Sequence, residues 1–548
     1  MLAAAAAAAA LPAPAAAARK SPAMDGARTY VEARAAAMRG DHERAASLLA
    51  ALAAADGDAA LIRRALGQAI SAGDMRLALS LARRLPQREL TVDGRLLLAA
   101  DELRNRRNER ALAFLGGTGE EGDLSFVAPL IQAWTAAERG DLAGALAIID
   151  RVPADSLLAA FKPENRALIL LKFRRSEEAE PFAGRAIENA GGRESRLRLA
   201  FADAFLAAGD RTRALAMIEG LGLERGVARA RILAGKPSGQ TIASAQQAFS
   251  ELLLGLAIEL NRVSDTLLPI GMAQVARYAD PRNSGATLLL ALLLDANDRS
   301  REALRVLEQV PAGDARVAQA RDAAARILND QKRFKEALAL AQRAVRDPGA
   351  GIADWARLGD VFRAMDRHDD AADAYGRAVM LATAEGLTSE LWPLHLLRAS
   401  ALESGNRWAE AKGALHAALA VAPEQPLVLN FLGYAKLERG EDLDVAEAMI
   451  RKASRLAPDD ASITDSLGWA LYKRGRLQQA IEVLQRAAAA DPQQAEIHEH
   501  LGDALFAAGR RFEARFAWAA ALITAEEKIA SRVKAKIETG LTPATAAP

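Results

Sequence analysis

The side chains that most often do chemistry in proteins are scarce in this chain of 548 residues, which has six histidines and no cysteine. The lack of cysteine excludes disulfides, thiolate zinc sites, thiol nucleophiles and cysteine-linked lipids. Two histidines, His498 and His500, lie close together in the segment EIHEH. Residues two apart on a helix do not share a face, so this pair is not expected to chelate one metal. We expect a surface or interhelical role for both, and predict neither a metal site nor a cofactor.

Two glycine-containing segments could suggest phosphate-binding loops, but neither fits one. GLGLERG (220–226) has the wrong spacing and no preceding strand, and AGKPSG (234–239) has Ala230 where a phosphate loop needs its first glycine. Both are expected to be loops between helices. Because no catalytic constellation is found, the chain is predicted not to be an enzyme.

Charge and composition restrict the classes of fold and partner. The chain has 71 Lys and Arg against 70 Asp and Glu, whereas a nucleic-acid-binding protein usually has a basic excess. The densest basic stretch, LRNRRNER (103–110), is short and is expected to be a solvated helix end, so no nucleic-acid partner is predicted. Alanine dominates nearly every stretch and aromatic residues make up only 5%, which favours helices over strands. The predicted fold class is therefore all-α.

The elements that must position any functional residue follow a repeat of about 34 residues. The clearest unit begins at Ile352, and its signature residues are Trp355, Leu358, Gly359, Phe362, Ala371, Tyr375 and Ala378. Two later units hold the same residue types in the same register, namely Leu467, Gly468, Ala480 and Pro492, then Leu501, Gly502, Ala514 and Ala521. This pattern resembles the tetratricopeptide repeat. The resemblance implies a right-handed α-solenoid of stacked helix-turn-helix units, in which small residues at the eighth and twentieth positions let the helices approach closely.

The turn between the two helices of a unit has its own signature at the fifteenth position. Glycine just past a helix end supplies a left-handed cap, and an aspartate after it can cap the next helix. This glycine occurs in six units, as Gly40, Gly73, Gly140, Gly209, Gly475 and Gly509.

The register predicts fourteen units with two interruptions. The predicted unit starts are residues 26, 59, 92, 126, 160, 195, 250, 284, 318, 352, 392, 426, 461 and 495. The step from 195 to 250 leaves an irregular spacer at residues 229–249, with a loop at Gly235–Gly239 that could mark a kink between two arms. The step from 352 to 392 reflects an insertion near residues 384–389.

These boundaries predict five segments. Residues 1–25 form a signal peptide or a disordered leader, 26–228 an N-terminal repeat array, 229–249 the spacer, 250–524 a C-terminal repeat array, and 525–548 a capping helix with a disordered tail. The leader has an apolar core but no basic residue before it, so two interpretations stay open. Either it is a signal peptide cleaved near Ala18 and the protein is exported to the periplasm, or it is a tail of a cytoplasmic protein. No later segment predicts a transmembrane span.

The resemblance implies that the first helix of each unit lines a concave groove, with positions 2, 5, 9 and 12 facing a partner. Applied to the last three units, this rule selects a row of acidic and aromatic residues as the candidate partner-binding site: Asn430, Tyr434, Asp465, Trp469, Tyr472, Glu499, Asp503 and Phe506. Tyrosine and tryptophan are typical interface anchors. The alternative is that Trp469 and Phe506 only fill gaps between neighbouring first helices. In the N-terminal array, Trp134 and Phe161 stand at comparable positions.

The same row predicts the chemistry of the partner. The chaperone-binding members of this family hold a C-terminal carboxylate with Lys and Asn at positions 5 and 9. Here Asp465 and Trp469, then Glu499 and Asp503, occupy these positions, so basic or apolar peptides are expected instead.

The predicted function is a protein–protein interaction scaffold or adaptor. Residues 429–522 resemble bacterial envelope repeat proteins, including adaptors that present substrates to carboxy-terminal processing proteases. This resemblance implies a role in the bacterial cell envelope. The alternatives are a cytoplasmic assembly or regulatory scaffold, and a non-catalytic modulator of a separately encoded enzyme such as a processing protease.

Overall fold

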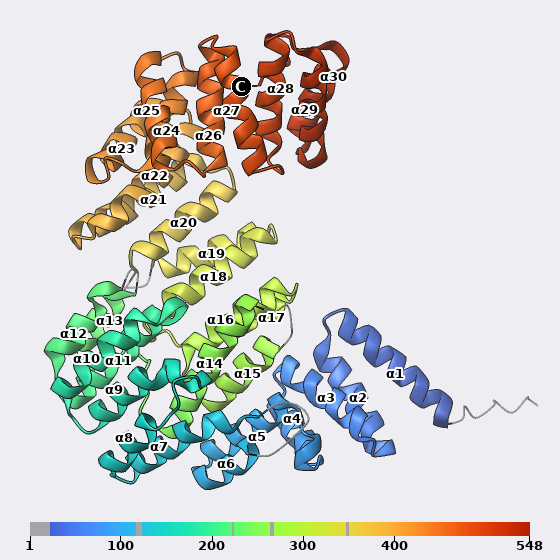
Figure 1. Cartoon of the computed structure of the whole chain (residues 1–548), viewed down its shortest axis with the longest axis vertical. Helices are drawn as coiled ribbons and strands as arrows, with labels where there is room; N and C mark the ends of the chain where they lie inside the picture. Colours follow the sequence, from blue (N-terminus) through green and yellow to red (C-terminus); the bar gives the residue numbers. More distant parts are fainter. Residues whose placement is uncertain (1–21, 117–122, 222–223, 264–267, 347–349, 548) are drawn as a thin grey trace, which may run out of the picture. The chain divides into compact units, whose positions relative to one another are not determined.

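The computed structural model describes residues 22–116, 123–221, 224–263, 268–346 and 350–547, and the predicted leader lies almost wholly outside them. Over these residues the chain folds into α-helices, labelled α1 to α30, and short 3-10 turns, without β-strands (Figure 1). This confirms the predicted all-α class. The chain forms two compact units, unit 1 ending at Gln331 and unit 2 beginning at Lys332. No helix of the described residues is both long enough and apolar enough to span a membrane.

Twenty-eight of these helices alternate along the chain as first and second helices of the predicted repeats, with α18 and α19 in different compact units, and each predicted start of a repeat coincides with the start of a first helix or lies within five residues of it. The first helices are α1 (Pro22–Met38), α3 (Ala59–Ala72), α5 (Val92–Arg104), α7 (Ala128–Glu138), α9 (Lys162–Lys172), α11 (Glu194–Ala208), α14 (Ala245–Val263), α16 (Ser284–Ala296), α18 (Val317–Asp330), α20 (Ile352–Ala364), α22 (Thr388–Ser404), α24 (Pro426–Glu438), α26 (Ala461–Lys473) and α28 (Ala495–Ala507).

The second helices follow short turns. They are α2 (His42–Asp56), α4 (Met75–Ala82), α6 (Asn108–Leu115), α8 (Leu142–Asp150), α10 (Ser176–Glu188), α12 (Arg211–Met217), α15 (Leu268–Ala279), α17 (Ser300–Leu307), α19 (Phe334–Ala344), α21 (His368–Ala384), α23 (Trp408–Val421), α25 (Leu443–Leu456), α27 (Leu477–Ala490) and α29 (Arg511–Thr524). Two helices stand outside the pairs, α13 (Arg225–Leu233) and α30 (Glu527–Thr539). The predicted insertion near residues 384–389 lengthens α21 and α22 to 17 residues each and leaves only a short turn between them.

In the described turns, each first helix is followed by at least one residue with positive φ. The predicted glycines adopt this conformation, and Asp74 after Gly73 accepts a hydrogen bond from the backbone of Leu77 at 3.0 Å, as the capping argument requires. In six other pairs a residue with a side chain takes the same left-handed conformation, namely Arg106, Arg174, Asp298, Lys332, Asp366 and Asn406. The turn geometry is therefore set by the repeat, and glycine is its least strained occupant.

Glycine at the eighth position lets the two helices of a pair approach closely. A Cβ placed on Gly468 of α26 would lie 2.5 Å from Cγ of Leu484 in α27, and one on Gly433 of α24 would lie 2.7 Å from Cγ1 of Ile450 in α25. Any larger residue would force these helices apart. The predicted role of this position is therefore confirmed.

Unit 1 uses part of its own chain to cover the side formed by its first helices. The hairpin α14–α15 packs with α15 against α3 and α5, and with α14 against α7 (Figure 1). The Tyr278 hydroxyl donates to Asp101 of α5 at 2.7 Å, and the backbone N–H of Ala245 donates to Glu138 of α7 at 2.8 Å. Trp134 and Phe161 are buried here, so neither is exposed to a partner.

The predicted spacer is present as an irregular segment between α13 and α14, but it lies inside unit 1. The Asp203 carboxylate on α11 accepts hydrogen bonds from the backbone N–H groups of Ser238 and Gln240. The Gln240 side-chain amide donates to Asp314 at 2.9 Å. These buried bonds tie the segment to helices on both sides of it, so it joins the predicted arms within one unit, and the two compact units divide between α18 and α19 instead.

A buried ion network fixes α14 in this position. Glu251 of α14, with a side chain 1% exposed, lies 3.1 Å from Arg196 and 3.6 Å from Arg193, both from the segment that carries α11. Arg193 also pairs with Glu164 of α9 at 2.9 Å. Since isolated buried charges are costly, these residues depend on one another.

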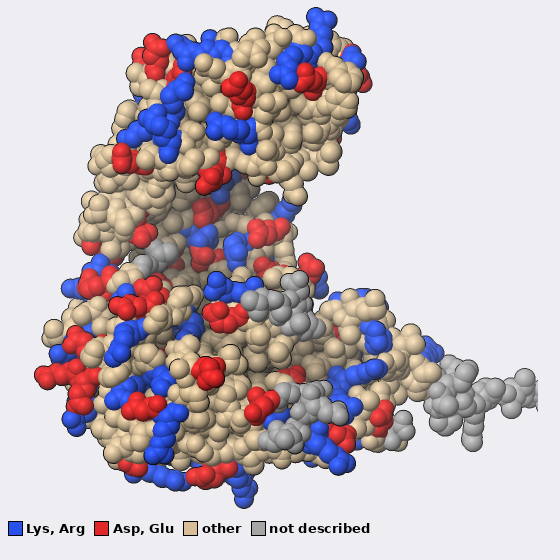
Figure 2. Space-filling model, viewed as in Figure 1, with Lys and Arg blue, Asp and Glu red and all other residues tan. Residues whose placement is uncertain are grey.

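Charged side chains on the surface are interspersed. Figure 2 shows Lys and Arg mixed with Asp and Glu on the face seen, without a broad area of one sign. This distribution agrees with the nearly equal numbers of basic and acidic residues.

The turn geometry predicts opposite effects for two glycines that both have open space at Cβ. Gly509→Ala places an L-residue at a φ of +82° and should lower the free energy of unfolding by about 1–2 kcal/mol. Gly413→Ala, inside α23, should raise it by up to about 1 kcal/mol because alanine restricts the unfolded chain. Urea unfolding followed by circular dichroism measures both, and a loss of equal size in both variants would contradict the turn assignment.

The ion network predicts a large loss of stability on removal of Glu251. Glu251→Ala removes the α14 carboxylate that compensates the buried charges of Arg196 and Arg193. The change should lower the free energy of unfolding by about 3–5 kcal/mol. Glu259→Ala is the matched control, because Glu259 lies on the same helix with a side chain 65% exposed and should cost less than about 1 kcal/mol. Thermal and urea unfolding of the two variants compare them, and similar losses would refute the role of the network.

Candidate partner-binding groove

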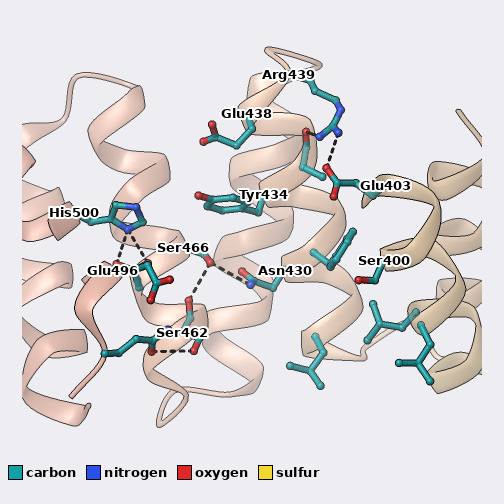
Figure 3. A pocket seen from close by; sticks show the side chains of 17 residues that line it. Ser400, Glu403, Asn430, Tyr434, Glu438, Arg439, Ser462, Ser466, Glu496 and His500 are labelled. Atoms are coloured by element: carbon teal, nitrogen blue, oxygen red, sulfur yellow. Dashed lines mark hydrogen bonds and ion pairs between the residues drawn. The ribbon is translucent and has the colours of Figure 1, made fainter. Parts of the chain in front are cut away.

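Unit 2 has an open pocket of about 640 Å³ along its first helices α22, α24, α26 and α28 (Figure 3). Because consecutive first helices stack side by side, one or two side chains from each turn of helix reach the same channel. The residues that line the pocket are Leu396, Leu397, Ser400, Glu403, Leu427, Asn430, Phe431, Tyr434, Ala435, Glu438, Arg439, Ser462, Asp465, Ser466, Gln494, Glu496 and His500.

Three of the predicted site residues line this pocket, namely Asn430, Tyr434 and Asp465. Asn430 donates its Nδ2 to the Ser466 hydroxyl at 3.2 Å, while its Oδ1 is buried and accepts no hydrogen bond from the described residues. Burial raises the pKa of the Tyr434 phenol, and the carboxylates of Glu438, Asp465 and Glu496 raise it further. Tyr434 is therefore a neutral hydroxyl surrounded by acidic groups.

The acids of the pocket are neutralised to different degrees. Glu403 pairs with Arg439 at 2.7 Å, and Asp465 accepts from His500 at 2.9 Å. Glu438 accepts a hydrogen bond from the Trp469 indole at 3.0 Å and lies 3.4 Å from Lys473. Glu496 is exposed and has no ion-pair partner in the part of the chain that the structure describes.

Trp469 lies in the interior and is not available to a partner. Its ring is fully buried and stacks between Tyr472, at a centroid distance of 4.7 Å, and His500, at 4.1 Å. The prediction that it contacts a partner is therefore wrong for this conformation, and the gap-filling alternative is correct. The reason is that the next first helix, α28, places the His500 ring directly over it.

Glu499 and Asp503 are also covered, in this case by the C-terminal segment. Lys536 of α30 lies 2.6 Å from Glu499 and 2.7 Å from Asp503, and all three side chains are almost fully buried. Arg532 adds a second contact to Glu499 at 2.6 Å. The helix α30, predicted as a cap, thus covers the last repeat and pairs with its acids. Neither Glu499 nor Asp503 is accessible to a partner.

The residues after α30 correct a second prediction. Residues 542–547 were expected to be a disordered tail, but the backbone N–H of Ala547 donates to Asp503 at 3.1 Å and Ala547 is buried. Phe506 is half-buried, and Gly540 lies against its ring. Tyr472, also half-buried, stacks on Trp469. The tail therefore folds back over the end of the groove.

Several pocket residues were missed by the sequence analysis although its own rule selects them. Position 2 of the last three units corresponds to Leu427, Ser462 and Glu496, and positions 5 and 12 of the unit that starts at 392 correspond to Leu396 and Glu403. The signal was therefore present in the register. These residues are not aromatic, unlike Tyr434, Trp469, Tyr472 and Phe506 in the predicted row.

The histidine pair separates as expected. His498 is half-buried and its Nε2 donates to the carbonyl of Pro492 at 3.0 Å, whereas His500 is buried between helices. Among the described residues no group of three or more His, Cys, Asp or Glu side chains is arranged to hold a metal ion.

His500 gives a pH-dependent prediction. Burial lowers its pKa, but Asp465, Asp503 and Glu499 outweigh burial, and the net pKa lies above the ordinary value of 6.5. A raised folded pKa means that the ion pair with Asp465 stabilises the protein fully below pH 6.5, and that this contribution is lost as the pH rises through the folded pKa.

Proton NMR titration of the histidine rings tests this prediction. The His500 ring should titrate above 6.5, while His42 and His395, whose pKa values are lowered mainly by burial, should titrate below it in the same sample. The stability difference between wild type and His500→Gln should also shrink as the pH rises. A His500 ring that titrates below 6.5 would disprove the assignment.

Comparison with known proteins agrees with this geometry. Residues 396–462 match a family model described as "Tetratricopeptide repeat", and residues 468–509 match one described as "TPR repeat". No curated protein matches the chain in sequence.

Among solved structures, the chain is similar to one from the APC/C hetero-tetramer Cut9–Hcn1, with 15% identity over 95% of this chain and 97% of that chain, at a TM-score of 0.38. It is similar to yeast Tom70, with 13% identity over 94% and 95%, at 0.32. MamA AMB-1 matches 28% of this chain and 94% of its own, with 24% identity and a TM-score of 0.24. The two matched segments contain tetratricopeptide repeats, and the other described helices follow the same order of first helix, turn and second helix.

Proposed function

We propose that this protein is an interaction scaffold that binds a segment of a partner protein in the pocket of unit 2. The observation that carries this proposal is that a pocket lies open along α22, α24, α26 and the residues Glu496 and His500 of α28. The helix α30 covers the remaining groove residues of α28, where Lys536 donates to Asp503. A volume of about 640 Å³ lies within the range of roughly 300–1,000 Å³ that is typical of ligand sites.

The lining of the pocket supports recognition of side chains rather than of a backbone alone. Leu396, Leu427 and Phe431 provide apolar contact area, and Tyr434 combines a large ring with a hydroxyl. Leu427 is 47% exposed, so part of its side chain is available for contact with a partner. Burial of these groups by a partner would supply binding energy.

We place this scaffold in the bacterial cell envelope, on the basis of the apolar, alanine-rich leader and the resemblance of residues 429–522 to envelope adaptors. In this role the protein would act by binding and would leave any reaction to its partner, including a processing protease. The alternative is a cytoplasmic scaffold. Mass spectrometry of the mature N-terminus separates the two, because cleavage near Ala18 supports export and an intact Met1 contradicts it.

The groove proposal predicts position-specific crosslinking in native cells. A photoreactive phenylalanine at Leu427 should crosslink to a discrete partner, whereas the same group at Ile523, which is 83% exposed on α29, should not give that product. Tyr434→Ala should weaken capture of this partner about 10-fold or more, as expected for the loss of an interface anchor worth about 2 kcal/mol. Phe512→Ala, which removes an exposed ring on α29, is the control.

Two results would reject the proposal. One is a Tyr434→Ala variant that stays helical by circular dichroism and captures the partner as wild type does. The other is turnover of a substrate by the purified protein alone, which would replace a binding role by a catalytic one.

A further inference from the structure

We propose that the partner segment carries a lysine or arginine whose cationic group binds beside Tyr434, between Glu438 and Glu496, and that apolar side chains flank it. This inference rests on the proposed function, because it names the chemistry of the segment that fills the same pocket. Figure 3 shows Tyr434 lying between Glu438 and Glu496.

The first argument is the surplus of negative charge that the pocket retains. Four carboxylates line it, from Glu403, Glu438, Asp465 and Glu496, against two basic side chains. Arg439 is occupied by Glu403 and His500 by Asp465. Lys473 lies 3.4 Å from Glu438, and Glu496 has no such neighbour among the described side chains. An anionic segment would be repelled by this lining, and a cationic one would be attracted.

The second argument is that the chain itself shows how this groove holds a cation. One repeat further on, the groove positions hold Glu499 and Asp503, and Lys536 from α30 is inserted between them with a side chain that is 0% exposed. Arg532 of the same helix also contacts Glu499. A basic amphipathic helix therefore already lies on one end of this line of first helices.

The third argument is a buried acceptor without a donor. Asn430 lines the same pocket, and its buried Oδ1 accepts no hydrogen bond from the described residues. An ammonium or guanidinium group donates several hydrogen bonds and has no acceptor, so it satisfies such an oxygen as well as carboxylates. A carboxylate from a partner cannot do this.

The apolar part of the lining completes the description of the partner. Leu396 comes from α22 and Leu427 and Phe431 from α24, whereas Glu496 comes from α28. A segment that crosses the pocket from α22 to α28 therefore meets these apolar groups before it reaches Glu496. An amphipathic helix with a basic residue beside leucine or aromatic residues fits this order.

Designed peptides test this assignment with the full-length protein. Three fluorescein-labelled helical peptides share the same leucine positions and carry Lys, Gln or Glu at the polar positions. Fluorescence anisotropy measures their dissociation constants. The Lys peptide should bind at least about 10-fold more tightly than the Gln peptide, and the Glu peptide more weakly than both.

The variant Glu438→Gln with Glu496→Gln should bring the Lys peptide to the affinity of the Gln peptide and leave the Gln peptide unchanged. Glu496→Gln alone should produce part of this loss, and Glu496 makes no side-chain hydrogen bond to the described residues that this change would remove. Glu482→Gln with Glu527→Gln changes two exposed acids outside the pocket and should leave all three affinities as in wild type. This control separates the pocket from general attraction between acidic protein and basic peptide.

The outcomes distinguish the two proposals. Equal binding of the Lys and Gln peptides, or a Lys preference that survives in the double Gln variant, overturns the cation site, and so does a failure of all three peptides to bind. The proposed function is judged separately by Tyr434→Ala. If this variant weakens the Lys and Gln peptides equally, the groove binds peptides without a cation site, and if it changes neither peptide, the pocket is not where they bind.

Discussion

The close approach of two antiparallel helices is the constraint on which this structure depends. The approach requires a small residue at the eighth position, such as Gly468 against Leu484, and a left-handed residue in the turn, such as Gly475. Both requirements are local, so the chain can repeat them with little other sequence in common. Where a residue such as Arg174 or Asp366 replaces the turn glycine, the fold keeps the geometry and accepts the strain.

A stack of such pairs leaves the side formed by the first helices uncovered, and this protein covers much of that side with its own chain. In unit 1 the hairpin α14–α15 packs on α3, α5 and α7, secured by Glu251 and its arginines. In unit 2 the helix α30 and the residues after it close the groove at α28. Between α22 and α28 the groove of unit 2 stays open as a pocket, and this gives the proposed binding site its position.

Buried charge explains both the covered and the open parts. Acidic residues along the first helices must be paired when they are buried, because an isolated buried carboxylate is costly. Lys536 satisfies Glu499 and Asp503, and His500 satisfies Asp465. Glu496 is exposed and has no such partner among the described residues, so the surface next to the covered end still offers a carboxylate to a basic group from outside.

The sequence by itself determined the helix pairs, their turns and their register, because these depend on glycine, alanine and apolar spacing within about 34 residues. It also selected Asn430 and Tyr434, which follow from that register. It did not determine that Trp469 and Asp503 are buried, because this depends on His500 one repeat later and on Lys536 from a helix outside the repeat. The same holds for the contact of Arg299 with Ser71, 228 residues apart. Only the tertiary structure decides such contacts, since a periodic pattern specifies the face that a side chain occupies within its own repeat but not which distant segment will cover that face.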